Sequence, residues 1–122
     1  MKTKKNQIWN FNSEIESEVC GEGVKRKILA YADELMCVEN HFEKGAIGAL
    51  HHHPHTQITY VVSGQFEFTI NGEKKIVNPG DALIKILIAF GQVETYGIIY
   101  KFVNAPKCIG FIYIICVPVG RF

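Results

Sequence analysis

Short runs of strand-forming residues, separated by turn residues, constrain the fold of this chain more than any other feature of its sequence. After residue 23, runs rich in Val, Ile, Tyr and Phe alternate with Gly, Asn and Pro, which is typical of strands and turns. The runs cover residues 24–31, 34–43, 57–77, 82–90, 97–103 and 109–119. Because none shows convincing helical periodicity, the sequence predicts an all-β fold, an antiparallel sandwich or barrel.

The third run contains two dipeptides that favour tight turns, Ser63-Gly64 and Asn71-Gly72. Asn-Gly is a strong hairpin signal, because both residues tolerate the positive φ angles that a two-residue hairpin turn requires. We therefore expect residues 57–77 to form two consecutive hairpins.

Residues 1–23 are mostly polar and end at the turn Gly21-Glu22-Gly23. We expect an N-terminal arm or a short edge element here, with a turn near residues 12–19. Within the arm, Trp9 is expected to be a packing anchor, for example against a second subunit. Since we find no repeat, linker or second domain, residues 24–122 are expected to form one β-barrel domain.

Composition and charge exclude several classes of protein. With 48% hydrophobic and 20% charged residues the chain is typical of globular proteins, and a net charge of +1 provides no basic field for nucleic acid. The longest apolar stretch, 109–119, is well short of the ~20 residues of a membrane-spanning helix, and no signal peptide is visible. Four cysteines without C-x-x-C spacing indicate reduced, mostly buried thiols and a cytoplasmic location.

Four of the five histidines lie in one stretch, GALHHHPHTQITYVVSG, residues 48–64. Side chains alternate along a strand, so His51 and His53 would face the same side. Gln57 opens the next strand and could face both of them. Two imidazoles and an amide oxygen would form three corners of a mononuclear site for zinc, nickel, iron or manganese.

The side-chain directions of the other two histidines of this stretch are considered separately. His52 is expected to point away from its neighbours, and Pro54 leaves the direction of His55 open. His55 is therefore the reserve candidate for a further ligand. The alternative interpretation is a solvated loop that binds metal adventitiously, as histidine-rich tracts do.

The spacing of five residues around this stretch resembles the first motif of the cupin superfamily, with glutamine where glutamate is usual. These residues are Gly45, His51, His53, Gln57 and Gly64. The resemblance implies a single antiparallel cupin β-barrel, also described as a jelly roll or double-stranded β-helix, with a metal at its mouth.

Residues 42–73 are also similar to the pectin-degradation cupins of KdgF type, in which the glutamine serves as a ligand, and residues 24–45 resemble the strands that precede the motif there. This resemblance implies an unsaturated uronate substrate from pectin or alginate breakdown, which would be opened or ketonised. It also implies a homodimer, since the family often pairs through edge strands.

The expected ligand types favour an anionic partner for the metal. Because His51, His53 and Gln57 are neutral, a divalent ion would keep its full charge and attract a carboxylate or enolate. This agrees with a uronate, whose oxygens the metal would polarise as a Lewis acid. A catalytically silent cupin that binds a metal or small molecule, for example in sensing, is the alternative.

The second half of the chain departs from the cupin pattern. Counted from Gly80, the second-motif positions hold Ile86, Ile88, Gly91 and Thr95, and a slip of one residue would put Phe90 at the histidine position. The fourth ligand is therefore missing from the motif. Water or His55 could complete the shell, the barrel could be non-catalytic, or the segment after Asp81 could fold differently.

The C-terminus departs as well. KdgF-type chains end in a segment similar to Asp-x-Phe-Ser/Thr-Pro-x-Arg, and alignment on Pro118 places Ile114 at the acid, Cys116 at the aromatic residue and Gly120 at the arginine. No catalytic residue is assigned, because this alignment leaves the acid–base position without an acid.

Two further groups of residues carry structural expectations. Glu39, His41 and Glu43 are expected to be solvated, and a place near the mouth of the barrel is the alternative for His41. The aromatic residues Tyr60, Phe66 and Phe68 are expected to pack in the core or the sheets.

Overall fold

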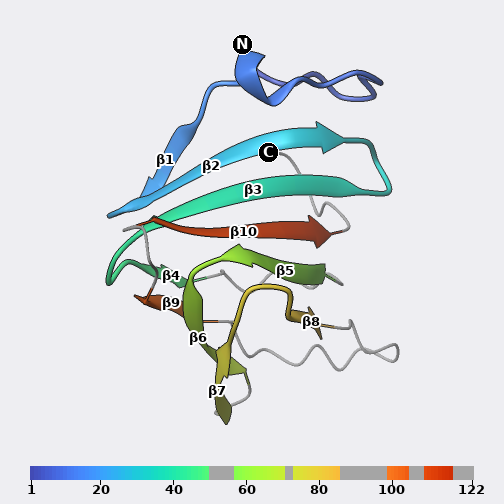
Figure 1. The fold of residues 1–122 in the computed structure, drawn as a ribbon. Coiled ribbons are helices and arrows are strands. Elements are labelled where there is room, and N and C mark those ends of the chain that lie inside the picture. The colour runs from blue at the N-terminus through green and yellow to red at the C-terminus, as the bar shows by residue number, and fades with distance from the viewer. Residues whose placement is uncertain (50–56, 71–72, 86–98, 105–108, 117–122) are drawn as a thin grey trace.

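The structure is a computed structural model that describes residues 1–49, 57–70, 73–85, 99–104 and 109–116 (Figure 1). Its elements are η1 (Asn12–Glu14), β1 (Glu18–Gly21), β2 (Val24–Tyr31), β3 (Met36–Glu43), β4 (Ile47–Ala49), β5 (Gln57–Ser63), β6 (Gln65–Ile70), β7 (Glu73–Val77), β8 (Ala82–Lys85), β9 (Ile99–Asn104) and β10 (Ile109–Cys116). The regular secondary structure of the described part of the chain is thus almost entirely strand, which confirms the all-β prediction. None of its helices is long and apolar enough to cross a membrane.

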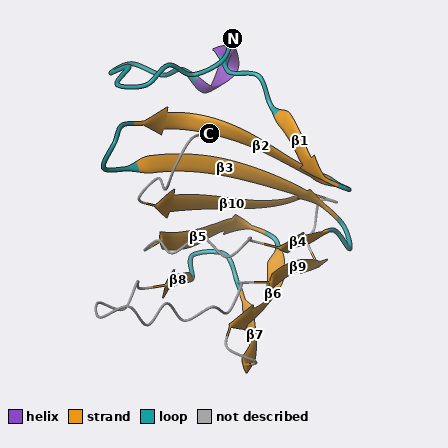
Figure 2. Ribbon diagram, turned by 180° about the vertical axis from the view of Figure 1, so that it is seen from behind, coloured by secondary structure: helices purple, strands orange, loops and turns teal. Residues whose placement is uncertain are grey.

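The strands form two sheets, and every pairing between described strands is antiparallel. The six-stranded sheet has the order β1-β2-β3-β10-β5-β8, and the four-stranded sheet has the order β4-β9-β6-β7. The last described strand, β10, lies between β3 and β5, so the centre of the larger sheet is formed by segments that are far apart in the sequence. Figures 1 and 2 show the N-terminal arm beyond β2, at the end of this sheet away from β5 and β8.

Of the two hairpins predicted for residues 57–77, the first is wrong and the second is confirmed. β5 pairs with β10 and β8, whereas β6 pairs with β9 and β7, so the chain changes sheets between β5 and β6. The change takes place at Gly64, whose φ of 84° is a backbone conformation that residues with a side chain rarely adopt. A glycine of this kind permits a sharp bend as well as a hairpin, and the distant partner strands select the bend.

The core lies between the inner faces of the two sheets. Its buried residues are Val24, Met36, Val38, Phe42, Ala46, Val61, Phe66, Phe68, Ile112, Ile114 and Cys116. Phe66 packs edge-on against Phe42 with ring centroids 5.3 Å apart, and this confirms the predicted packing of Phe66 and Phe68. Tyr60 instead lies on the outer face of its sheet, where it is 44% exposed.

Hydrogen bonds and strand pairing hold the N-terminal segment against the edge of the larger sheet. The Asn6 amide donates to the Tyr31 carbonyl oxygen at 2.9 Å, the Thr3 hydroxyl donates to the Ile28 carbonyl, and β1 pairs with β2. The predicted turn near residues 12–19 is present as η1. Residues 1–23 therefore contain both an arm and an edge strand.

Candidate functional site

Gln57 is the member of the predicted ligand set that lies within the described residues. It is the first residue of β5, its side chain is on the inner face, and it is 1% exposed. In register it lies opposite Cys116 of β10, which in turn lies opposite Met36 of β3. His51, His53 and His55 lie outside the described residues, so their part in the site stays a prediction.

A hydrogen bond orients the amide of Gln57. Its Nε2 donates to the hydroxyl oxygen of Thr59 at 3.1 Å, and Thr59 is itself 2% exposed. In an amide side chain, the carbonyl oxygen Oε1 is the atom that can bind a cation. A buried, oriented, neutral oxygen donor fits the role that the sequence predicted for Gln57.

The described side chains of β10 and β3 that lie in line with Gln57 and Thr59 on the inner face are apolar or neutral. Thr59 lies opposite Ile114 of β10, which is 5% exposed, and Ile114 lies opposite Val38 of β3. Ile114 and Cys116, the positions aligned with the acid and the aromatic residue, therefore do face the interior. Burial raises the pKa of the Cys116 thiol, so this group is neutral near pH 7.

No group of three or more histidine, cysteine, aspartate or glutamate side chains is placed to hold a metal ion within the part of the chain that the structure describes. Two of the three predicted ligands, His51 and His53, are outside that part, as are the second-motif positions. The second-motif positions are Ile86, Ile88, Phe90, Gly91 and Thr95. Of the three predicted ligands, the structure therefore describes Gln57 alone.

The thiols differ from the expectation that they are mostly buried. Among the described cysteines, all free, only Cys116 is buried, whereas Cys20 is exposed and Cys37 is partly exposed. Strand alternation explains the difference, because Cys37 precedes Val38 in β3 and therefore faces outward.

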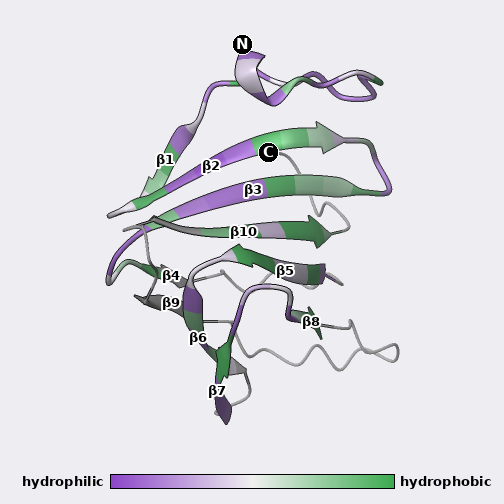
Figure 3. Ribbon diagram, viewed as in Figure 1, coloured by the Kyte–Doolittle hydropathy of each residue, from purple (hydrophilic) through white to green (hydrophobic). Residues whose placement is uncertain are grey.

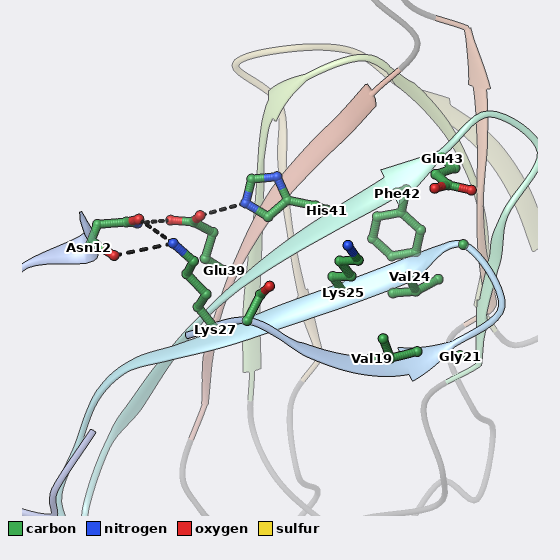
Figure 4. A pocket seen from close by; sticks show the side chains of 12 residues that line it. Asn12, Val19, Gly21, Val24, Lys25, Lys27, Glu39, His41, Phe42 and Glu43 are labelled. Carbon is green, nitrogen blue, oxygen red and sulfur yellow. Dashed lines mark hydrogen bonds and ion pairs between the residues drawn. The ribbon is translucent and has the colours of Figure 1, made fainter. Parts of the chain in front are cut away.

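A second polar cluster lies on the outer face of the larger sheet, where the arm crosses β2 and β3 (Figure 4). Figure 3 shows that the hydrophilic halves of β2 and β3 lie side by side, and Lys27 is in register with Glu39. The cluster borders a pocket of about 460 Å³. The pocket is lined by Asn12, Ser17, Val19, Gly21, Gly23, Val24, Lys25, Lys27, Glu39, His41, Phe42 and Glu43.

Glu39 is the centre of this cluster and is 3% exposed, so the expectation that it is solvated is wrong. Its Oε2 accepts from Asn12 Nδ2 at 2.5 Å, and its Oε1 lies 2.5 Å from His41 Nε2. Lys27 Nζ donates to Asn12 Oδ1 at 2.8 Å and to the Asn12 carbonyl oxygen at 3.2 Å. Asn12 thus ties the arm to two strands, and the arm is what buries the carboxylate.

His41 also faces outward, away from the interior where Gln57 lies. Its ring packs edge-on against Phe111 of β10, with centroids 4.4 Å apart, and Phe111 packs in the same way against Tyr113 at 5.1 Å. The outer cluster is therefore continuous with aromatic side chains of β10 and separate from the candidate metal site.

Replacement of Asn12 by alanine is expected to loosen the arm. The change deprives the buried Glu39 carboxylate of a donor, which costs about 1–3 kcal/mol of unfolding free energy. Urea unfolding would measure the loss, and limited proteolysis would report faster cleavage within residues 1–17. Gln7→Ala is the control, since the Gln7 amide bonds only to the Trp9 carbonyl within the arm; equal stability of the two variants would contradict the role of Asn12.

Tyr113 predicts a pH dependence of stability. Burial raises the pKa of Tyr113 and the nearby Glu39 carboxylate raises it further, so the folded state holds the phenol proton more tightly. The stability linked to this proton is fully present below the ordinary pKa of about 10 and is lost as the pH rises through the higher folded value. Urea unfolding above pH 10 should show a smaller alkaline loss for Tyr113→Phe than for the unmodified chain or the exposed control Tyr60→Phe. Identical pH profiles would refute the expectation.

Comparisons of the sequence with known proteins agree with this architecture. The Cupin_2 family profile, described as a cupin domain, matches residues 38–85. Over 70 residues the chain is 51% identical to the pectin degradation protein KdgF of Dickeya dadantii (strain 3937). The matched stretch covers 57% of this chain and 64% of that protein, less than two thirds of its length.

Two solved structures have similar folds over nearly the whole chain. An RmlC-like cupin from Shewanella frigidimarina NCIMB 400 matches with a TM-score of 0.76 and 29% identity over 93% of each chain. KdgF from Halomonas sp. matches with a TM-score of 0.73 and 28% identity, over 93% of this chain and 96% of that one. The family profile, the relative and the shared two-sheet fold confirm the resemblance to the cupin superfamily inferred from the first motif, and within that superfamily the chain resembles the KdgF-type members.

Proposed function

We propose that the chain is a cytoplasmic, metal-dependent cupin that acts on unsaturated uronates. His51, His53 and Gln57 would hold a divalent ion of zinc, nickel, iron or manganese. The observation that carries the proposal is the placement of Gln57, whose amide is buried on the inner face and oriented by Thr59. The similarity to a protein named for pectin degradation supports the substrate class.

The three proposed ligands determine the chemistry of such a site. When bound, the ion would supply Lewis-acid polarisation of sugar oxygens and attraction for the uronate carboxylate. Gln57 would leave the charge of the ion uncompensated, because its amide is neutral. The apolar side chains of Val38 and Ile114 would keep water from one side of the site, and a low local dielectric strengthens electrostatic contacts with the substrate.

Proton transfer is the step for which the described inner-face side chains offer no carboxyl group. General acid–base catalysis contributes about 10²–10⁴-fold to enzymatic rates, and the aligned acid position is Ile114. A uronate reaction at this site would depend on solvent, on the substrate or on groups beyond the described residues for its proton.

The oriented amide of Gln57, without a nearby described carboxylate, also favours the alternative function. An interior with an oriented amide but without a carboxylate among its described side chains suits a catalytically silent cupin that binds a metal or a small molecule. The two functions share the metal site and differ in turnover, so they need separate tests.

Metal binding is tested by the metal content of the purified protein after reconstitution and dialysis. We expect one ion per chain, and its loss in the double variant His51→Ala with His53→Ala and in Gln57→Leu, since each removes ligands. His41→Ala and His52→Ala are the controls, because neither residue is expected to face the site. Metal content that is the same in the double variant and the controls would show adventitious binding and contradict the proposal.

Turnover is tested with an unsaturated uronate, whose conjugated double bond absorbs in the ultraviolet. We expect the metal-loaded protein to speed the loss of this absorbance, and the double histidine variant to be inactive at equal concentration. Ile114→Asp would place a carboxyl group at the aligned acid position and is expected to increase the rate by about tenfold or more, toward the 10²–10⁴-fold that is usual for general acids. A metal-loaded chain that leaves the substrate unchanged would refute the enzymatic function and support the silent cupin.

A further inference from the structure

The pocket on the outer face of the larger sheet has the size of a small-molecule site. Val19 of β1, Lys25 of β2 and His41 of β3 line it in one row across the three strands. Lys27 and Glu39, in register with each other, form the next row. The volume of about 460 Å³ is within the usual range of about 300–1,000 Å³ for sites that bind small ligands.

Hydrogen bonds fix the polar groups at the end of the pocket where the arm crosses. One oxygen of Glu39 accepts from Asn12 Nδ2 and the other lies against His41 Nε2, each at 2.5 Å. A carboxylate only accepts hydrogen bonds, so Nε2 of His41 carries a proton. Lys27 Nζ donates to two oxygens of Asn12, which orients its ammonium group. This end of the pocket is therefore ordered before any ligand binds, which lowers the entropic cost of binding.

Lys25 and Glu43 are the charged groups of the pocket that remain available to a ligand. Neither side chain has a hydrogen bond or an ion pair with another residue in the described ranges. Figure 4 shows Lys25 between the cluster at Asn12 and the carboxylate of Glu43. Glu43 is two residues beyond His41 in β3, or about 7 Å further along the strand. The pocket is thus cationic at Lys25 and Lys27 and anionic at Glu43.

The arm borders the pocket but does not fill it. Asn12 and Ser17 of the arm are among the lining residues. Trp9 is 73% exposed, so the expectation that it is a packing anchor is not met within the chain. At the opposite end the lining residues Gly21 and Gly23 have no side chains to occupy the space. Among the described residues, the hollow is therefore left open for a small molecule.

We propose that this pocket binds a small carboxylate that carries hydrogen-bond donors about 7–10 Å from its anionic end. The carboxylate would lie between the ammonium groups of Lys25 and Lys27, and the donors would bind the Glu43 carboxylate. A cation is disfavoured at the arm end, because it would meet two ammonium groups and both oxygens of Glu39 are already engaged. Sugar acids, through hydroxyl groups, and amino acids, through an ammonium group, share the required chemistry.

Titrations of the full chain, followed by two-dimensional amide NMR, test the proposal residue by residue. The probes are glucuronate, ε-aminocaproate and caproate, the last of which has the carboxylate but no donor at its other end. We expect saturable shifts at the amides of Lys25, Lys27 and His41 with the first two probes and weaker binding of caproate. Shifts confined to Gln57 and Thr59 would locate binding at the interior site, which the proposal does not involve. That result, or no saturable shift at all, would overturn the outer site.

Matched substitutions show whether the charges of the pocket carry the binding. Lys25→Gln should weaken the binding of ε-aminocaproate about fivefold, as is usual for a partly exposed ion pair. Lys74→Gln on β7 is the control, since it removes the same charge from the other sheet. Glu43→Gln should weaken the binding of ε-aminocaproate but not of caproate. Equal affinities of the Lys25 and Lys74 variants would overturn the proposal.

A second variant tests the same site by added charge. Val19 is 74% exposed and in register with Lys25, so Val19→Glu would pair with the lysine and repel the carboxylate without a change in the core. Its control is Ile76→Glu, at a residue of β7 that is 48% exposed. Unchanged affinity in Val19→Glu would contradict the site. Caproate that binds as tightly as the other two probes would refute the role of Glu43, and the tighter of those two identifies the donor as hydroxyl or ammonium.

Discussion

The alternation of side chains along β5 is the constraint on which both surfaces of this protein depend. Gln57, Thr59 and Val61 are buried, whereas the residues between them, among them Ile58 and Tyr60, are exposed. Pairing with β10 on one side and β8 on the other fixes this arrangement. A shift of one residue in register would exchange the faces, so the positions of the candidate ligand and of the exposed apolar residues of β5 are determined together.

Local sequence patterns predict individual strands and turns. They do not predict which strands pair when the partners are far apart in the chain. The run 24–31 coincides with β2, and the inward position of Gln57 follows from alternation and from the motif spacing. The hairpin at Gly64 was a wrong prediction because the alternative partner of β5 is β10, far along the chain. A turn dipeptide specifies that the chain bends but not which strand it meets.

Glu39 illustrates the same limit for side chains. In the sequence it is a charged residue in a polar stretch, for which solvation is the ordinary expectation. Its burial requires the arm, and the contact joins Asn12 to a strand 27 residues later. Alternation does place Glu39 and His41 on the outer face, but no pattern in the sequence indicates what crosses that face.

Two neighbouring positions on the inner face, Gln57 and Ile114, have opposite chemistry. An amide buried among apolar side chains is unfavourable unless it is bonded, and Gln57 is bonded to Thr59, which is itself buried. Two apolar residues would fill the same space without that requirement, so this polar pair contradicts the local rule in the way that functional sites do. At the aligned acid position, Ile114 follows the rule and packs in the core. The described interior therefore favours the holding of a ligand over the transfer of a proton. For this reason metal content and turnover, measured on the same preparations, separate the two proposed functions.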